Sequence, residues 1–172
     1  MASSKRLFVA LWPDEPVRRQ LYARQQQIMT NTGFTQGRVA FENMHMTLQF
    51  LGQVSVTALD QLDSRLSRVA VPSFQLTLDC RGQFAKTGIL WLGPSQPADS
   101  LLQLQADVAA ACRPYHKTAG KTYSPHVSLF RKCHRPVPLT VLEPVEWLID
   151  HFVLVESMMH SQGVQYRLLQ TY

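Results

Sequence analysis

The chain has 172 residues, of which 45% are hydrophobic and 17% charged, so it can bury a core of its own without a metal ion or disulfide bonds. Its 17 Lys and Arg residues exceed its 12 Asp and Glu residues, and the formal net charge of +5 favours phosphate-bearing partners without identifying one. The three cysteines, Cys80, Cys112 and Cys133, form no C-x-x-C pair, which argues against a disulfide framework and a zinc ribbon.

Hydrophobic periodicity predicts alternating strands and helices along the chain. In chain order we expect a strand over 7–12, a turn at 13–16 that leads into a helix through about Met29, a strand that carries His45 and ends at Gly52, and a helix over 54–69. We then expect strands over 74–80 and 89–92 that pair with each other, a helix over 100–112, a strand over 125–130, and strands near 147–156 and 164–169. The run Gln25 to Gln27 suits the solvated face of the first helix. This order predicts an α+β fold, in which one domain of two related lobes has two antiparallel sheets and flanking helices around a central groove.

The beginning of the sequence does not predict a secretion signal. The apolar residues 7–12 follow Lys5-Arg6, but the run is short and leads directly into Pro13-Asp14-Glu15. No apolar run in the sequence approaches the roughly 18 residues of a membrane span. We expect a cytoplasmic protein without a membrane partner, and we expect it to be a monomer.

A short phrase occurs twice, 81 residues apart, as His45-Met46-Thr47-Leu48 and His126-Val127-Ser128-Leu129. On a β-strand, side chains two residues apart share one face. Each phrase therefore presents an imidazole beside a hydroxyl on one face and turns its apolar residues toward a core. If the lobes are related by pseudo-symmetry, the two phrases face each other and flank one reacting atom.

Other interpretations of the phrases are weaker. A third His-x-Thr occurs at His116-Lys117-Thr118-Ala119, but it lies in a polar stretch, and we interpret it as noise or as part of a basic rim. A single copy would be typical of a half-buried structural histidine, whereas two copies favour catalysis. A metal site is an alternative, but no Asp, Glu or Cys lies at a ligand spacing beside His45 or His126. A Ser nucleophile is another, but neither hydroxyl lies on a nucleophile elbow.

The two phrases resemble the motif of the two-histidine (2H) phosphoesterases, and in particular the branch of bacterial RNA 2′,3′-cyclic phosphodiesterases and 2′-5′ RNA ligases. The resemblance continues in the expected order along most of the chain, through Arg6 to Ala10, His45 to Gly52, Phe74 to Cys80 with Gly82-Gln83-Phe84, Leu90 to Gly93, and Pro125 to Arg131. Ser128 departs from the family pattern, in which Thr is commoner. It keeps the hydroxyl but lacks the methyl group that restricts the rotamer.

The resemblance implies an enzyme that opens 2′,3′-cyclic phosphate ends of RNA and leaves a 2′-phosphate, without a metal or another cofactor. It implies that His45 is the acid for the departing 3′-oxygen and that His126 is the base for water. Imidazoles with a pKa near about 6.5 suit both tasks, although the sequence alone does not orient the pair. Thr47 and Ser128 would donate hydrogen bonds to the non-bridging phosphate oxygens.

Two residues after the second phrase are further candidates. The guanidinium of Arg131 matches phosphate oxygens, but strict alternation turns it away from His126, so it needs a bulge or the strand end to reach the site. Otherwise Arg131 is a solvated charge. Phe130 shares the His126 face and is expected either to line the substrate pocket, where it could stack on a base, or to belong to the core.

Three functions remain open from the sequence. The leading one is RNA end processing, with tRNA halves among the candidate substrates, and the same site run backwards would join RNA ends without ATP. The sequence contains no Walker A loop and no Lys-x-Asp-Gly of nucleotidyl-transferring ligases. The alternatives are an RNA-binding module that recognises phosphate without turnover, and a phosphodiesterase for a small cyclic nucleotide or an ADP-ribose cyclic phosphate.

Overall fold

Antiparallel strands and three helices make up the structure, a computed structural model that describes residues 3–115, 122–137, 142–161 and 163–172. The strands are β1 (Ser4–Leu11), β2 (Met46–Ser55), β3 (Phe74–Leu78), β4 (Cys80–Phe84), β5 (Ile89–Gly93), β6 (Val127–Phe130), β7 (Val145–Ile149), β8 (Val153–His160) and β9 (Gly163–Thr171). The helices are α1 (Glu15–Thr32), α2 (Leu59–Leu66) and α3 (Asp99–Cys112), with short 3-10 turns η1 (Phe41–Asn43), η2 (Val56–Ala58) and η3 (Arg113–Tyr115).

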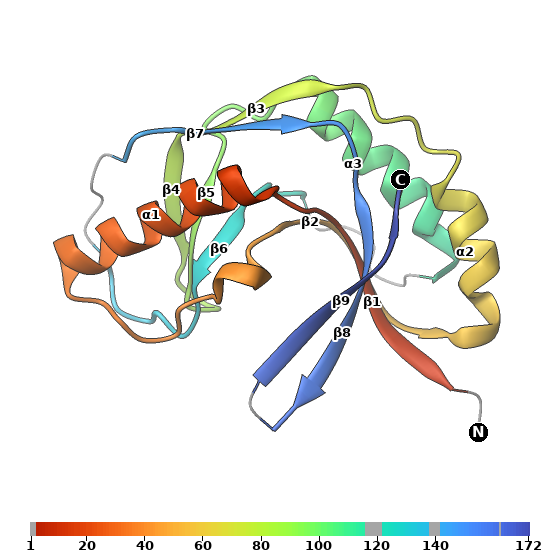
Figure 1. The fold of residues 1–172 in the computed structure, drawn as a ribbon, viewed down its shortest axis with the longest axis horizontal. Coiled ribbons are helices and arrows are strands. Elements are labelled where there is room, and N and C mark those ends of the chain that lie inside the picture. The colour runs from red at the N-terminus through yellow and green to blue at the C-terminus, as the bar shows by residue number, and fades with distance from the viewer. Residues whose placement is uncertain (1–2, 116–121, 138–141, 162) are drawn as a thin grey trace.

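Seven strands form one sheet in the order β4-β5-β6-β2-β1-β8-β9, and β3 pairs separately with β7 (Figure 1). All the strand pairs in both sheets are antiparallel. The predicted α+β class with two antiparallel sheets and flanking helices is confirmed.

The main core lies between the large sheet, the helices and the small sheet. Leu21 of α1, Leu62 of α2 and Leu104 of α3 are buried in one cluster with Leu7 and Val9 of β1. On the other face of the large sheet, a smaller cluster contains Phe8, Ala10, Val153 and Val155. Strand β1 therefore alternates between a face covered by the core and a second face that remains available for a site.

Local sequence explains both ends of α1. The Asp14 side chain accepts a hydrogen bond from the Val17 backbone N–H at 3.0 Å, and Pro16 lies in the first turn. Gly33 ends the helix with a φ of 65°, and its N–H bonds to the Met29 carbonyl at 2.8 Å. The helix thus continues three residues beyond the predicted end. It ends at Thr32 because Gly33, the next residue, adopts the left-handed conformation that terminates a helix.

The predicted boundary at Gly52 is wrong. Gly52 has a φ of 71° and lies next to an irregularity in the β1–β2 register, so β2 bends there and continues until Ser55 pairs with Ser4. Val54, expected to start a helix, is 3% exposed and packs into the core from the strand. The helix predicted over 54–69 is the shorter α2.

Two predicted strands each divide between the two sheets. The strand expected over 74–80 ends at Leu78 in the small sheet, and Cys80 begins β4 in the large one. Between them, the Asp79 carboxylate accepts hydrogen bonds from the N–H and Oγ of Ser95, both at 2.7 Å. The predicted pairing of 89–92 with 74–80 is therefore wrong, because β5 pairs with β4. The strand near 147–156 likewise divides into β7 and β8.

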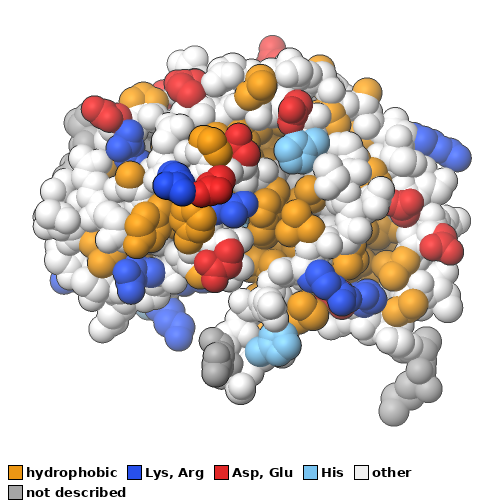
Figure 2. Space-filling model, viewed as in Figure 1, with side chains coloured by type: hydrophobic (Ala, Val, Ile, Leu, Met, Phe, Trp, Pro, Cys, Tyr) orange, Lys and Arg blue, Asp and Glu red, His pale blue; other side chains and the backbone are white. Residues whose placement is uncertain are grey.

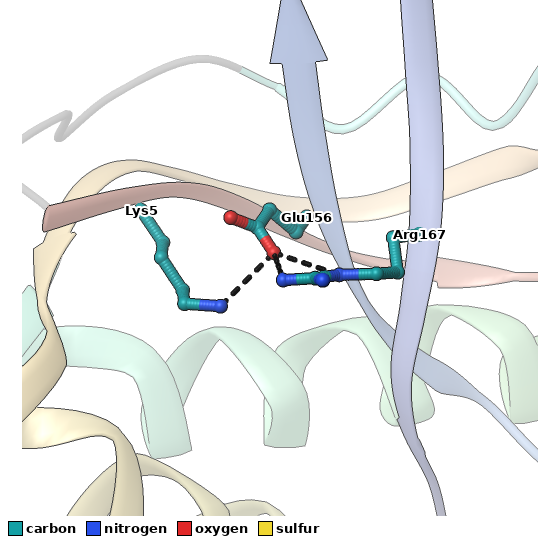
Figure 3. Close-up of polar contacts among 3 residues, drawn as sticks. All are labelled: Lys5, Glu156 and Arg167. Carbon is teal, nitrogen blue, oxygen red and sulfur yellow. Dashed lines mark hydrogen bonds and ion pairs between the residues drawn. The ribbon is translucent and has the colours of Figure 1, made fainter.

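The β8–β9 hairpin extends beyond the rest of the large sheet, and Figure 2 shows it projecting from the lower edge of the molecule. Glu156 of β8 is 9% exposed and accepts hydrogen bonds from Lys5 Nζ and Arg167 Nε, both at 3.1 Å (Figure 3). Burial raises the pKa of Glu156, but the hydrogen bonds and charges of Arg167 and Lys5 outweigh it and hold the pKa below its usual value. This cluster joins β1, β8 and β9 at the base of the hairpin.

No helix within the described parts of the chain is long and apolar enough to cross a membrane.

Candidate active site

The two phrases lie on neighbouring strands in the middle of the large sheet. Met46 of β2 pairs with Val127 of β6, and both side chains are fully buried in the core. The antiparallel register of that pair sets His45 opposite Ser128 and Thr47 opposite His126. Diagonal neighbours in such a ladder are about 7–8 Å apart. The structure therefore brings both imidazoles and both hydroxyls to one face of the sheet.

Each imidazole is held by the same kind of hydrogen bond. His45 Nδ1 lies 2.7 Å from the Asn43 carbonyl oxygen, and His126 Nδ1 lies 2.8 Å from the Ser124 carbonyl oxygen. A carbonyl oxygen only accepts, so Nδ1 carries the proton in both rings. Nε2 of each histidine is left to accept a proton when the ring is neutral and to donate one when it is charged.

Three aromatic rings surround His45. The imidazole stacks on Trp12 with centroids 5.2 Å apart and planes 7° apart, Phe8 lies at 5.0 Å, and Tyr166 of β9 makes an edge contact at 5.2 Å. None of the three was predicted from the sequence as a site residue. Alternation along β1 places Phe8 on one face with Ala10, which was a usable signal, whereas the position of Tyr166 depends on the pairing of β8 with β9.

His126 has two aromatic neighbours, which were also missed. Phe84 of β4 makes an edge contact at 4.9 Å, and Trp91 of β5 lies at 6.2 Å. Trp91 pairs with Ser128 in the β5–β6 ladder, and its ring lies over Gly82. A Cβ at Gly82 would come within 2.1 Å of that ring, so the residue at this position has to be glycine for Trp91 to reach the site.

Burial lowers the pKa of both histidines. The pKa of His45 falls to about 4, mainly because of burial and further because of the charges of Arg131 and His126, while the hydrogen bond to Asn43 opposes the shift. The pKa of His126 is also lowered by burial and then by Arg131, against the hydrogen bond to Ser124. Both rings are therefore neutral at pH 7 in the free protein. A phosphate anion between them would raise both pKa values, because negative charge favours the imidazolium.

Phe130 belongs to the core, and its predicted place in the substrate pocket is wrong. The register of β5 and β6 shifts between the pairs Trp91–Ser128 and Leu90–Phe130, so β6 contains an extra residue, Leu129. This bulge turns Phe130 inward, where it is 0% exposed and packs edge-on against Phe34 at 5.3 Å.

The same bulge changes the alternation of side chains before Arg131, so that Arg131 is no longer turned away from the face of His126. Arg131 follows β6 directly and is exposed, and its charge acts on both His45 and His126. The strand-end position and the bulge therefore place a cation near both imidazoles, where it can attract an anion.

Comparison with known proteins agrees with this arrangement. The chain matches the model of the 2′-5′ RNA ligase superfamily over residues 13–158. It belongs to this family.

Two relatives align with this chain over most of its length. RNA 2′,3′-cyclic phosphodiesterase of Escherichia coli (strain K12) is 32% identical over 141 residues, which cover 81% of this chain and 78% of the relative. The enzyme of the same name from Thermotoga maritima is 27% identical over 175 residues, which cover 95% of this chain and 92% of the relative. The crystal structure of E. coli LigT complexed with 3′-AMP superposes with a TM-score of 0.89 at 27% identity, over 99% of this chain and 98% of that one.

In this member of the 2′-5′ RNA ligase superfamily, a buried glutamine secures the His126 side of the site. Gln25 is 1% exposed, and its Nε2 donates to the carbonyls of Val39 at 2.9 Å and Leu129 at 2.7 Å. The prediction that Gln25 belongs to the solvated face of its helix is wrong, because these two carbonyls satisfy its amide inside the core. Gln25 thus ties α1 to the bulge of β6.

A close backbone contact completes this attachment. The Arg131 N–H bonds to the Gly37 carbonyl at 2.7 Å, and a Cβ at Gly37 would lie 1.8 Å from the Arg131 carbonyl oxygen. Gly37 also has a φ of 64°, so a side chain there would be strained as well as crowded. The loop before η1 therefore supports the end of β6 from which Arg131 projects.

Within the described residues, no three His, Cys, Asp or Glu side chains gather as a metal-binding group. The third phrase, residues 116–119, lies outside the described residues.

Proposed function

We propose that this chain hydrolyses the 2′,3′-cyclic phosphate at RNA ends to a 2′-phosphomonoester, with His45 and His126 as acid and base and without a metal ion. One observation carries the proposal: the pairing of Met46 with Val127 puts two imidazoles on one sheet face, each with Nδ1 bound to a carbonyl and Nε2 left for a reactant. The names of the relatives, RNA 2′,3′-cyclic phosphodiesterases, support the same substrate class.

The reaction divides between the two histidines. Neutral His126 accepts a proton from water at Nε2 as the water oxygen bonds to phosphorus. The bond from phosphorus to O3′ breaks, and protonated His45 gives its Nε2 proton to O3′. Each imidazole contributes about 10²- to 10⁴-fold by such proton transfer.

The surroundings of His45 support its assignment as the acid. The face of Trp12 stabilises the imidazolium that must form when substrate binds. Burial disfavours the charged form of His45 and lowers its pKa in the free protein, so the proton that the acid donates is held there by the negative charge of the bound phosphate. The less enclosed His126 is left as the base for incoming water.

The hydroxyls and Arg131 act on the phosphate itself. Thr47 and Ser128 lie beside the imidazoles on the same face and donate hydrogen bonds to the two non-bridging oxygens. Arg131 offsets the negative charge that builds there in the transition state. None of the three takes part in a covalent step.

Three finer points belong to the same proposal. We place the enzyme in the cytoplasm, where its cysteines, Cys80, Cys112 and Cys133, are free. We expect a monomer, because all the residues assigned to the reaction come from one chain. Among RNA ends, tRNA halves with a cyclic phosphate are candidate substrates.

The test is multiple turnover of an oligonucleotide with a 2′,3′-cyclic phosphate end in the presence of EDTA, followed by analysis of the product end. We expect turnover to a 2′-phosphate, and its loss in His45→Ala and in His126→Ala. Binding without turnover would overturn the proposal in favour of a phosphate-binding module. Turnover of small cyclic phosphates alone would overturn the RNA assignment.

Ligation is a second candidate function, favoured by the match to a 2′-5′ RNA ligase family. In this reaction a 5′-hydroxyl takes the place of water. His126 accepts its proton as the 5′-oxygen bonds to phosphorus, the bond from phosphorus to O3′ breaks, and His45 protonates O3′, with no nucleotide consumed. A 5′-hydroxyl oligonucleotide added in excess should give a 2′-5′ linked product. A product that forms only with ATP would contradict this mechanism.

A further inference from the structure

Phe50 is an aromatic residue near the site that the proposed reaction does not use. It lies on β2, and its side chain is 67% exposed. Phe50 pairs with Phe8 in the β1–β2 ladder, and the two rings are 6.1 Å apart, while the Phe8 ring is 5.0 Å from His45. The exposed ring therefore extends the aromatic wall of His45 outward, one ring beyond Phe8.

The row that contains Phe50 crosses four strands. Phe8 pairs with Phe50 on one side and with Val155 on the other, and Val155 pairs with Leu168, which is 44% exposed. Residues directly opposite each other in a ladder project from the same face. The histidine face thus continues into an apolar strip whose two ends reach solvent.

An arginine lies on the same face of the sheet as the exposed ring. The β1–β8 register is regular, so alternation along β1 places Arg6 on the same face as Phe8. Arg6 is exposed and belongs to the strand next to Phe50. An exposed ring and an arginine on one face of neighbouring strands present the two groups that single-stranded nucleic acids bind, a stacking surface for a base and a positive charge for a phosphate.

We propose that Phe50 stacks on the base of the nucleotide next to the reacting one, and that Arg6 binds the phosphate of that nucleotide. This inference rests on the proposed function, since the reacting phosphate is taken to lie between His45 and His126. Phe8 separates Phe50 from His45, so a mononucleotide held at the histidines does not reach Phe50. The subsite makes the enzyme prefer an RNA strand to a mononucleotide.

The experiment compares two substrates, a nucleoside 2′,3′-cyclic phosphate and an RNA trinucleotide that ends in the same group. Phe50→Leu keeps an apolar side chain but removes the ring. We expect KM for the trinucleotide to rise about 5- to 150-fold, the loss of one base–aromatic stack, with kcat and KM for the mononucleotide within about twofold of wild type. Phe50→Trp should restore the low KM.

Two controls make the result specific. Leu148→Ala removes another exposed apolar side chain, which lies on β7 in the small sheet. It should leave kcat and KM unchanged for both substrates. A trinucleotide that lacks the base next to the reacting nucleotide should bind wild type and Phe50→Leu equally weakly.

The outcomes separate this inference from the proposed function. If wild type turns over both substrates and Phe50→Leu leaves the trinucleotide KM unchanged, the subsite is wrong and the proposed function stands. An equal loss for both substrates in Phe50→Leu would also overturn the subsite. If wild type turns over neither substrate, both proposals fall.

Discussion

The surroundings of His45 and His126 differ although their backbone attachment is the same. Each Nδ1 bonds to the carbonyl two residues earlier, at 2.7 and 2.8 Å. His45 lies among three rings and stacks on one of them, whereas His126 has two aromatic neighbours. The repeated phrase thus sets the direction in which each Nε2 points, and packing from other strands sets how readily each ring takes up a proton.

The largest expected effect is the loss of either imidazole. His45→Ala and His126→Ala should each lower kcat about 10²- to 10⁴-fold, because each removes a proton-transfer group. Single-turnover kinetics at saturating substrate would measure this. A variant whose kcat fell less than tenfold would show that its histidine has no part in the chemical step. It would contradict the joint role of the two histidines.

Loss of the hydroxyl beside each imidazole should have the next largest effect on kcat. Thr47→Val and Ser128→Ala each remove one hydrogen-bond donor to the phosphate and should lower kcat about 10²- to 10³-fold. Steady-state kinetics on the cyclic-phosphate oligonucleotide measures the effect. Ser128→Thr keeps the hydroxyl and is the matched control, expected near wild type; equal losses in Ser128→Ala and Ser128→Thr would contradict a donor role.

The lowered pKa of His45 predicts a pH-dependent stability. His45 has a pKa of about 4 in the folded protein and about 6.5 when unfolded, so folding disfavours its charged form. The penalty is absent well above pH 6.5 and grows as the pH falls from 6.5 toward 4, to at most about 3 kcal/mol.

Asparagine variants measure this penalty without breaking the anchor, since the Asn amide can replace Nδ1–H as a donor. Urea unfolding of His45→Asn should lose less stability between pH 7.5 and 4.5 than wild type. His126→Asn should show a change in the same direction. Identical pH dependence in wild type and His45→Asn would contradict the buried, neutral state of His45.

A smaller effect, on stability, is expected from Gln25, which supports the strand that carries the His126 phrase but not the one that carries the His45 phrase. Gln25→Leu removes the side-chain donor of the Val39 carbonyl and one of two donors of the Leu129 carbonyl, which also accepts from the Val39 N–H at 2.9 Å. It should lower the free energy of unfolding by about 1–3 kcal/mol. Gln26→Leu is the control, because Gln26 Nε2 has no hydrogen-bond partner among the described residues, and it should be near neutral. Chemical unfolding compares the two, and equal effects would show that the Gln25 bonds add nothing.

The sequence predicted what depends on local pattern. The strands that carry the two phrases and the sharing of one face by each imidazole and its hydroxyl follow from a period of two residues. What it missed depends on partners far along the chain. Gln25 looks solvated until α1 packs on β6, and Phe130 appears to face the site until an irregularity in its pairing with β5 turns it inward.

The aromatic neighbours were missed for the same reason. Trp12 reaches His45 because β1 pairs with β2, and Tyr166 reaches it because β1 pairs with β8 and β8 with β9. Similarly, alternation continues from Phe74 to Cys80, although the chain changes sheets at Asp79. Periodicity records which side chains share a face, but not which strand lies next to them.

The most direct test of the central claim, that two imidazoles act on opposite sides of one phosphorus, is a crystal structure with a nucleoside–vanadate complex, which mimics five-coordinate phosphorus. The account predicts His126 Nε2 within about 2.6–3.2 Å of one apical oxygen and His45 Nε2 at the same distance from the other, the one bonded to the ribose. Vanadate bound by a single histidine, or with both imidazoles on the same oxygen, would contradict it.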